Sequence, residues 1–238
     1  MNIENLYFPA GKIKSVFFDA AGTLFDVKDS VGEIYSSFAR QYGADPNPQM
    51  IQADFVRYFS QQPPLAFERG MADIRRNELE RNWWRLIVES VFAGHPIRQF
   101  DQFFDELFEY FRTGDAWRLY DDVLPTLLKL KKNGIGLGVI SNFDSRLPDL
   151  LSNLGIFDLF DSVHISSCEG AAKPDPVIFI SALGFHKIKP EEAIHVGDSL
   201  REDFEGAQSA GLSAVLIDRI GQNKSNYCIT RLDELMNS

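Results

Sequence analysis

The feature that most constrains this chain is an apolar run that ends abruptly in a carboxylate. The run that begins at Ser15 is rich in β-forming residues up to Phe18 and predicts a buried strand. It stops at Asp19, and Gly22 then allows the backbone to turn sharply. Open sheets of parallel strands bind ligands at the carboxyl ends of the strands. We therefore expect Asp19 at the ligand-binding edge of such a sheet.

Strand and helix patterns alternate along the rest of the chain. Four further apolar runs predict strands at Ile135–Ile140, Ser162–Ile165, Ala193–Val196 and Ala214–Ile217. Helical patterns cover Asp122–Lys132, Arg146–Leu154, Pro176–Leu183 and Leu200–Ala210. A glycine that we expect to end the helix follows each pattern, at Gly134, Gly155, Gly184 and Gly211. The alternation predicts an α/β fold with a doubly wound parallel sheet.

Residues 30–112 interrupt this alternation. They are helical in character, rich in aromatic residues and divided by prolines and glycines, with no clear strand pattern. We expect an all-helical insertion there. The remaining segments, 12–29 and 113–238, then form the sheet domain, and we expect no functional role for residues 1–11.

Composition excludes several classes of partner. The net charge of −10 argues against nucleic acid and anionic membranes, which need a cationic surface. No apolar run approaches the ~20 residues that span a bilayer. Two cysteines, Cys168 and Cys228, suit a reduced compartment better than a disulfide framework. We expect a cytoplasmic protein with no membrane partner, whose oligomeric state the sequence leaves open.

Four polar blocks fall at expected strand ends or helix starts. They are Asp19 with Thr23, Ser141-Asn142, Lys173–Pro176 and Gly197–Asp203. In a parallel sheet such blocks converge on one edge. Together they supply a nucleophilic carboxylate, a hydroxyl group, an ammonium group and two further acids. This set suits a phosphoryl group handled with a hard divalent cation.

In this order the blocks resemble the haloacid dehalogenase-like hydrolase superfamily over nearly the whole chain. The pieces Asp19–Phe25 and Ser141–Asp144 are similar to the branch of the rhythmically expressed insect gene product. The resemblance implies a sheet core of the Rossmann kind. It also implies that the helical insertion is a mobile cap over the site, and that the substrate is a small phosphorylated, anionic metabolite.

The same resemblance implies roles for individual residues. Asp19 attacks phosphorus and forms an aspartyl-phosphate, while Lys173 bridges Asp19 and the phosphoryl group. Ser141 binds a phosphoryl oxygen, aided by backbone N–H groups near Ala20 and Asn142, and Thr23 belongs to the same set. The resemblance further implies Mg²⁺, held by Asp19, by the carbonyl of Ala21 and by Asp198. Asp203 stands just behind and orients a water ligand of the metal.

Each of these residues also has a plain structural explanation. Asp19 and Thr23 can stabilise a turn, and Ser141-Asn142 can cap a helix. Lys173 can be a solvated surface residue, and the acids of Gly197–Asp203 can be favoured in the first turn of a helix. We expect Glu202 to be such an acid, and we expect His195, inside a strand, to be a satisfied core residue.

Ala21 departs from the family pattern. Phosphatases of this superfamily usually carry an aspartate there, which protonates the leaving group, and general acid–base help of that kind contributes ~10²–10⁴ in rate. One alternative is a phosphatase with good leaving groups or a substitute acid, such as Asp26, Asp144 or a cap residue. A second alternative is phosphonate cleavage, but similar enzymes of that kind need a lysine in the insertion to form a Schiff base, and no lysine lies between Lys28 and Lys129. A third alternative is 2-haloacid dehalogenation. A catalytically weak phosphate-binding or regulatory protein is the remaining alternative.

The insertion also carries a cluster of arginines and two adjacent tryptophans. The arginines are Arg69, Arg75, Arg76, Arg81 and Arg85. Acidic residues at helical spacing predict that they form surface ion pairs, although one or two could instead bind a substrate anion. Trp83 and Trp84 cannot share a helix face, so we expect one to pack and the other to line the interface of the cap.

Overall fold

The fold is built on a six-stranded parallel sheet, described by a computed structural model that covers residues 12–236. The strand order is β5-β4-β1-β6-β7-β8, so β1 is central. The bounds are β1 Ser15–Phe18, β4 Gly136–Ser141, β5 Ser162–Ile165, β6 Ala193–Gly197, β7 Ser213–Ile217 and β8 Cys228–Ile229. Residues 1–11, for which we expected no role, lie outside the described part.

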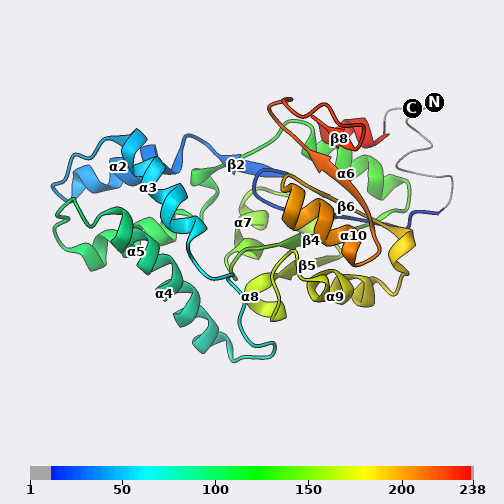
Figure 1. Ribbon diagram of the computed structural model, residues 1–238, viewed down its shortest axis with the longest axis horizontal. Coiled ribbons are helices and arrows are strands. Elements are labelled where there is room, and N and C mark those ends of the chain that lie inside the picture. Colours follow the sequence, from blue (N-terminus) through cyan, green and yellow to red (C-terminus); the bar gives the residue numbers. More distant parts are fainter. Residues whose placement is uncertain (1–11, 237–238) are drawn as a thin grey trace.

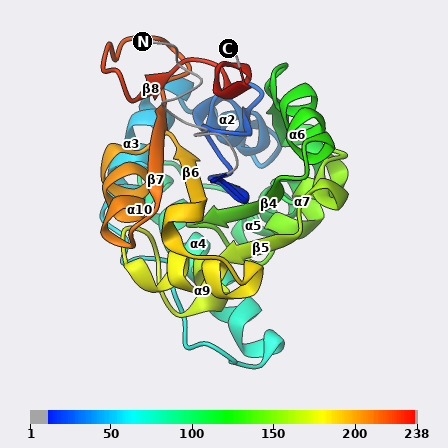
Figure 2. The same cartoon turned by 90° about the vertical axis from the view of Figure 1, so that its right-hand side faces the viewer.

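Helices cover both faces of the sheet, as Figure 2 shows. Alternate residues of a strand point to opposite faces. In β1, Val16 and Phe18 belong to a large apolar cluster shared with α6 and α7, whereas Phe17 joins a smaller cluster with α9. The helices are α6 Val123–Lys132, α7 Leu147–Asn153, α8 Ser166–Glu169, α9 Pro176–His186 and α10 Gly206–Ser209. The predicted doubly wound α/β architecture is confirmed.

The predicted boundaries are accurate to one or two residues, with two exceptions. Helix α9 runs through Gly184 to His186, so the expected stop at Gly184 is wrong. Lys187, with φ of 55°, takes the left-handed position instead. The expected helix Leu200–Ala210 consists of a π-helical segment, η4 Leu200–Glu205, followed by α10. The other short helices are η1 Gly114–Ala116, η2 Phe157–Leu159, η3 Pro190–Glu192 and η5 Leu232–Met236.

Four helices form a separate layer on the left in Figure 1, beside the sheet. They are α2 Val31–Gln41, α3 Pro48–Ser60, α4 Asp73–Val91 and α5 Phe100–Tyr110. Ser30 caps α2 by accepting a hydrogen bond from Glu33 N, and Asn47 caps α3 in the same way. A small two-stranded antiparallel sheet of β2 Phe25–Val27 and β3 Trp117–Leu119, the segments that lead into and out of the four helices, joins this layer to the six-stranded sheet. None of the helices described for residues 12–236 is long and apolar enough to cross a membrane.

Candidate active site

Three neighbouring strands deliver the polar residues of the site. Asp19 follows the last residue of β1, Ser141 is the last residue of β4, and Asp198 follows the last residue of β6. Because β4, β1 and β6 are parallel and adjacent, their carboxyl ends lie at one edge of the sheet. The order in which strands are added to the sheet also reverses at β1, since β4 and β5 lie on one side of it and β6 and β7 on the other. Ligands bind at such a switch point in open α/β sheets.

A buried lysine joins two of the acids. Lys173 is 4% exposed, and its Nζ lies 2.6 Å from Asp19 Oδ1 and 2.5 Å from Asp203 Oδ1. Asp203 Oδ1 also lies 2.8 Å from His195 Nε2, and Asp203 Oδ2 accepts a hydrogen bond from Ser199 N at 3.0 Å. The site is therefore held together by a continuous chain from Asp19 through Lys173 and Asp203 to His195.

The charges along this series of contacts shift the pKa values of Lys173, Asp203 and Asp19 in different ways. Burial would lower the pKa of the Lys173 ammonium, but Asp19 and Asp203 outweigh it and raise that pKa. Burial likewise opposes ionisation of Asp203, yet Lys173 and His195 hold the pKa of its carboxyl well below its usual range. For Asp19 burial prevails over Lys173, and the pKa is raised. Lys173 therefore stays cationic and is shared between the two acids.

Asp198 stands at the open side of the same cluster. Partial removal of solvent from its carboxylate is the largest cause that raises the pKa of Asp198 to about 7, although the residue as a whole is exposed. The negative charges of Asp19 and Asp203 raise it further. Lys173 alone thus leaves excess negative charge among three carboxylates.

The three carboxylates suit a divalent cation. Oxygen atoms of Asp19, Asp198 and Asp203 lie within 4.8 Å of one another. Gly22, with φ of +79°, leaves the room they need, because a Cβ there would lie 2.5 Å from Asp198 Oδ2. Hard carboxylate oxygens crowded in this way are the ligands that Mg²⁺ and Ca²⁺ prefer. The donor set and its excess charge therefore fit a hard cation.

Asn142 supports the lysine from behind. Its Oδ1 accepts a hydrogen bond from Lys173 N at 2.8 Å, and its Nδ2 donates to Lys173 O and to Glu202 Oε2, both at 3.0 Å. The side-chain amide thus fixes the backbone of Lys173. Glu202, expected to be only a first-turn acid, also contacts the site. Sequence reasoning missed this contact because the two residues are 60 positions apart.

The remaining expected residues differ in their surroundings. Ser141 is 3% exposed at the end of β4, and Ala20 is fully buried beside Asp19. Thr23 is also fully buried, and its hydroxyl finds no hydrogen-bond partner among residues 12–236. His195 is fully buried, but only Nε2 is paired and Nδ1 has no partner there, so it is not the satisfied core histidine we expected.

The loop after Ser141-Asn142 is fastened to the helical layer. Asp144 is fully buried, forms an ion pair with Arg146 and accepts a hydrogen bond from Trp84 Nε1 of α4 at 2.6 Å. Arg146 Nη1 donates to the carbonyl of Phe108 in α5 at 2.7 Å. Ser145 N donates to Glu80 of α4 at 3.1 Å. The expectation that one of the paired tryptophans lines the interface is confirmed, and that tryptophan is Trp84.

The same contacts remove one candidate for the missing acid. Arg146 lowers the pKa of Asp144 despite burial, so Asp144 is a poor proton donor. Asp26 is exposed on β2 and accepts a hydrogen bond from the Tyr120 hydroxyl at 3.3 Å. Of the two, only Asp26 remains as a substitute for the aspartate that Ala21 replaces.

The arginines of the helical layer form ion pairs with nearby acids. Arg75 pairs with Glu78 at 3.1 Å, and Arg76 pairs with Asp73 and Glu80. The pairs of the other three are Arg69–Glu169, Arg81–Asp105, Arg85–Glu89 and Arg85–Asp101. The expectation of ion pairs is confirmed, and each of these arginines is already balanced by an acid.

Comparison with curated proteins gives relatives across most of the chain. Haloacid dehalogenase-like hydrolase domain-containing protein 3 of Mus musculus is 33% identical over 213 residues, covering 87% of this chain and 82% of that protein. Rhythmically expressed gene 2 protein of Drosophila melanogaster is 28% identical, with coverage of 87% and 83%. Glyceraldehyde 3-phosphate phosphatase of Methanopyrus kandleri is 40% identical over 57% of this chain and 52% of its own length.

Solved structures agree with the fold. A phosphatase from Thermococcus onnurineus matches with a TM-score of 0.65 and 26% identity, covering 94% of this chain and 96% of that one. A 2-haloacid dehalogenase from Pseudomonas syringae matches with the same TM-score and coverage at 27% identity. The sequence model of the haloacid dehalogenase-like hydrolases matches residues 13–211. This chain therefore belongs to the haloacid dehalogenase-like hydrolase family.

Proposed function

We propose that this chain is a Mg²⁺-dependent phosphatase that acts on a small phosphorylated metabolite through an aspartyl-phosphate on Asp19. The observation that carries the proposal is the position of Lys173 Nζ, 2.6 Å from Asp19 and 2.5 Å from Asp203, beside a third carboxylate. An ammonium group there favours the ionised form of the nucleophile against the effect of burial and attracts a phosphoryl oxygen. The phosphatases among the relatives and solved structures are consistent with this activity.

The reaction divides into two displacements at phosphorus. A carboxylate oxygen of Asp19 attacks phosphorus, and the bond to the leaving oxygen breaks with its electron pair on that oxygen. Water then attacks the phosphorus of the aspartyl-phosphate, which releases phosphate and restores the carboxylate of Asp19. Ser141 and backbone N–H groups near Ala20 and Asn142 would hold the phosphoryl oxygens. Lys173 balances charge through both steps.

We infer that Mg²⁺ is held by Asp19, Asp198 and the carbonyl of Ala21, with Asp203 behind them. When bound, the cation would neutralise negative charge on the phosphoryl group. Lys173 alone cannot do this, because its single positive charge already lies among three carboxylates. The crowding of three carboxylates around a single ammonium group supports this assignment. We also propose that residues 30–112 act as the cap and the remainder as the catalytic core.

Ala21 sets the kind of substrate. With no carboxyl group there to protonate the leaving oxygen, substrates whose leaving group is already a stable anion are favoured. Acyl phosphates meet this condition because they release a carboxylate. A 2-haloacid dehalogenase is the second candidate, since a solved dehalogenase has the same TM-score as the phosphatase. The acidic cluster argues against it, because it places excess negative charge where a haloacid carboxylate would bind.

The test is a panel of phosphate esters and acyl phosphates, assayed for phosphate release with and without Mg²⁺ and paired with 2-chloropropionate assayed for chloride. We expect Mg²⁺-dependent phosphate release that is lost in Asp19→Asn and kept in Asp149→Asn, whose side chain is 60% exposed. Chloride release without phosphate release would establish the dehalogenase instead. Binding of phosphate with no turnover of any compound would indicate the regulatory alternative.

A further inference from the structure

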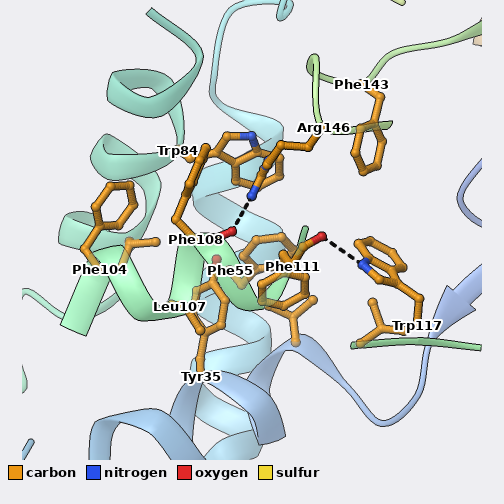
Figure 3. Close-up of a pocket in the computed structure, with 13 residues that line it drawn as sticks. Tyr35, Phe55, Trp84, Phe104, Leu107, Phe108, Phe111, Trp117, Phe143 and Arg146 are labelled. Atoms are coloured by element: carbon orange, nitrogen blue, oxygen red, sulfur yellow. Dashed lines mark hydrogen bonds between the residues drawn. The ribbon is translucent and has the colours of Figure 1, made fainter. Parts of the chain in front are cut away.

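A cavity lies where the helical layer meets the loop that follows β4, as Figure 3 shows. Its volume is about 80 Å³. Residues of α2, α3, α4 and α5 form most of its wall, and Phe143, Arg146 and Trp117 close it from the side of the sheet. The wall is almost entirely aromatic or aliphatic.

Four residues with polar side-chain groups line this wall, and three of these groups are already paired. The indole N–H groups of Trp84 and Trp117 donate to Asp144 Oδ2 at 2.6 Å and to the Phe111 carbonyl at 3.0 Å. Arg146 donates from Nε and Nη2 to Asp144 at 2.9 and 2.7 Å, and from Nη1 to the Phe108 carbonyl. Its guanidinium also lies 3.8 Å from the centre of the Phe108 ring. The charge of Arg146 is thus balanced by Asp144, so the cavity offers no free cation for an anionic ligand.

Tyr35 is the fourth polar group, and its hydroxyl is not paired. The residue is 3% exposed, and its hydroxyl makes no hydrogen bond with any residue in 12–236. In Figure 3 this hydroxyl points from α2 toward the middle of the labelled side chains. A hydroxyl at the wall of a cavity with no protein partner marks a position where a polar ligand atom would be favourable.

Segments that carry the site of the proposed reaction also form part of the cavity wall. Phe143 comes two residues after Ser141, and two residues of extended chain span at most ~7 Å. Trp117 lies in β3, which pairs with β2. Strand β2 in turn follows the turn after Asp19. Trp117 and Phe143 contact each other, with ring centres 6.1 Å apart. The wall is therefore built from segments that also carry the phosphoryl-binding residues.

The size of the cavity limits its occupant. An apolar cavity of about 150 Å³ stays dry and accepts benzene, so a cavity of about half that volume suits a shorter group. Water is disfavoured because a buried water needs two to four polar partners, and here only the Tyr35 hydroxyl is free. A short hydrocarbon chain satisfies both conditions.

We propose that this cavity receives the non-phosphorylated end of the substrate, an apolar chain of about three carbon atoms with at most one oxygen near Tyr35. The proposal rests on the proposed phosphatase function and names its substrate class. It favours short-chain acyl phosphates over sugar phosphates, whose many hydroxyls would lose their hydrogen bonds to water on entering an apolar cavity.

The test measures binding of phosphonates, which mimic phosphates but are not hydrolysed. Methyl-, propyl- and hexylphosphonate are titrated into the full chain with Mg²⁺ by calorimetry. Burial of each methylene should tighten binding about fourfold, so propylphosphonate should bind roughly tenfold or more tighter than methylphosphonate. Hexylphosphonate should gain nothing over propylphosphonate, because the cavity is then full.

Variants at Val88, Val56 and Tyr35 localise the effect. Val88, on the cavity wall, is 2% exposed, and Val88→Phe should abolish the advantage of the propyl group. Val56→Phe is the same substitution at a position of α3 that is 56% exposed, and it should leave the series unchanged. Where Val88→Phe does not fold, Val88→Ile should reduce the propyl advantage by a smaller factor. Tyr35→Phe should weaken 3-hydroxypropylphosphonate about fivefold and leave propylphosphonate unchanged.

The outcomes separate this proposal from the function on which it rests. Equal affinity for methyl- and propylphosphonate, or a propyl advantage that survives filling of the cavity, overturns the cavity assignment. Hydrolysis of acetyl phosphate under the same conditions would then leave the phosphatase proposal intact. No binding of any phosphonate, together with no phosphate release, overturns both.

Discussion

Removal of the Asp144 charge should cost this protein much of its stability. Asp144 is fully buried and accepts hydrogen bonds from Arg146 Nε, Nη2 and N at 2.9, 2.7 and 3.0 Å, and from Trp84 Nε1 at 2.6 Å. Asp144→Asn keeps the shape of the side chain but leaves the Arg146 guanidinium, 5% exposed, without a counter-charge. Breaking a buried pair on one side costs about 3–5 kcal/mol.

The assay is thermal unfolding of the variant beside the wild type. For a chain of this size, 1 kcal/mol lowers the Tm by about 2–4 °C, so Asp144→Asn should lower it by roughly 6–20 °C. Because Trp84 and Phe108 belong to the helical layer, the loss should also loosen its contact with the sheet domain. Amide hydrogen exchange in α4 and α5 should therefore increase.

Two controls isolate the charge. Asp149, on the helix α7 that follows this loop, is 60% exposed and lies 3.6 Å from Arg112, so Asp149→Asn should shift the Tm by less than about 2 °C. Replacement of both partners, Asp144→Leu with Arg146→Met, should recover at least half of the loss because no buried charge is left unpaired. A single Asp144→Asn variant with a Tm within about 2 °C of wild type would refute this reasoning.

Three further predictions concern the site and its supports. Ala21→Asp should raise hydrolysis of alkyl phosphates at least ~10-fold in steady-state assays and leave acetyl phosphate nearly unchanged, since only a poor leaving group needs a proton; an unchanged alkyl rate would show that position 21 does not face the leaving oxygen. The folded-state pKa of Asp144 is lowered, so its stabilisation is complete above the unfolded value of ~3.9 and is lost as pH falls through the folded value. The Tm difference between wild type and Asp144→Asn should therefore be constant from pH 7 to 5 and shrink in stronger acid, and a difference that grows there would contradict the sign. His195→Gln, whose amide can still donate to Asp203, should keep more turnover than His195→Leu at equal Tm, and equal loss in both would show that this hydrogen bond is not needed.

Sequence periodicity located five of the six strands of the sheet, because each of these five is a short apolar run bounded by turn residues. The sixth, β8, has only two residues and was not predicted. The ends of those five strands then carry Asp19, Ser141 and Asp198, so the edge of the sheet where the site lies could be predicted as well. The positions of the helix ends were less predictable. Gly184 remains inside α9, and Lys187, a residue type that the pattern of glycines does not point to, takes the left-handed position that ends the helix.

Contacts between distant segments could not be predicted from local pattern. Lys173 lies 154 positions from Asp19, and nothing in the sequence around either residue indicates that Nζ also reaches Asp203. The cost of burying a lysine decides this geometry, because the ammonium group is tolerated only between two carboxylates. The pair Asp144 and Arg146 is similar. Both are polar residues in a loop, and their burial follows from α4 and α5 packing over them.

The central claim is that Asp19 becomes covalently phosphorylated. The most direct measurement is acid quenching of the enzyme during turnover of labelled acetyl phosphate with Mg²⁺, followed by mapping of the labelled peptide. We predict label on Asp19 in the wild type, and neither label nor phosphate release in a folded Asp19→Asn variant. Label on another residue, or phosphate release by Asp19→Asn at the wild-type rate, would contradict the account.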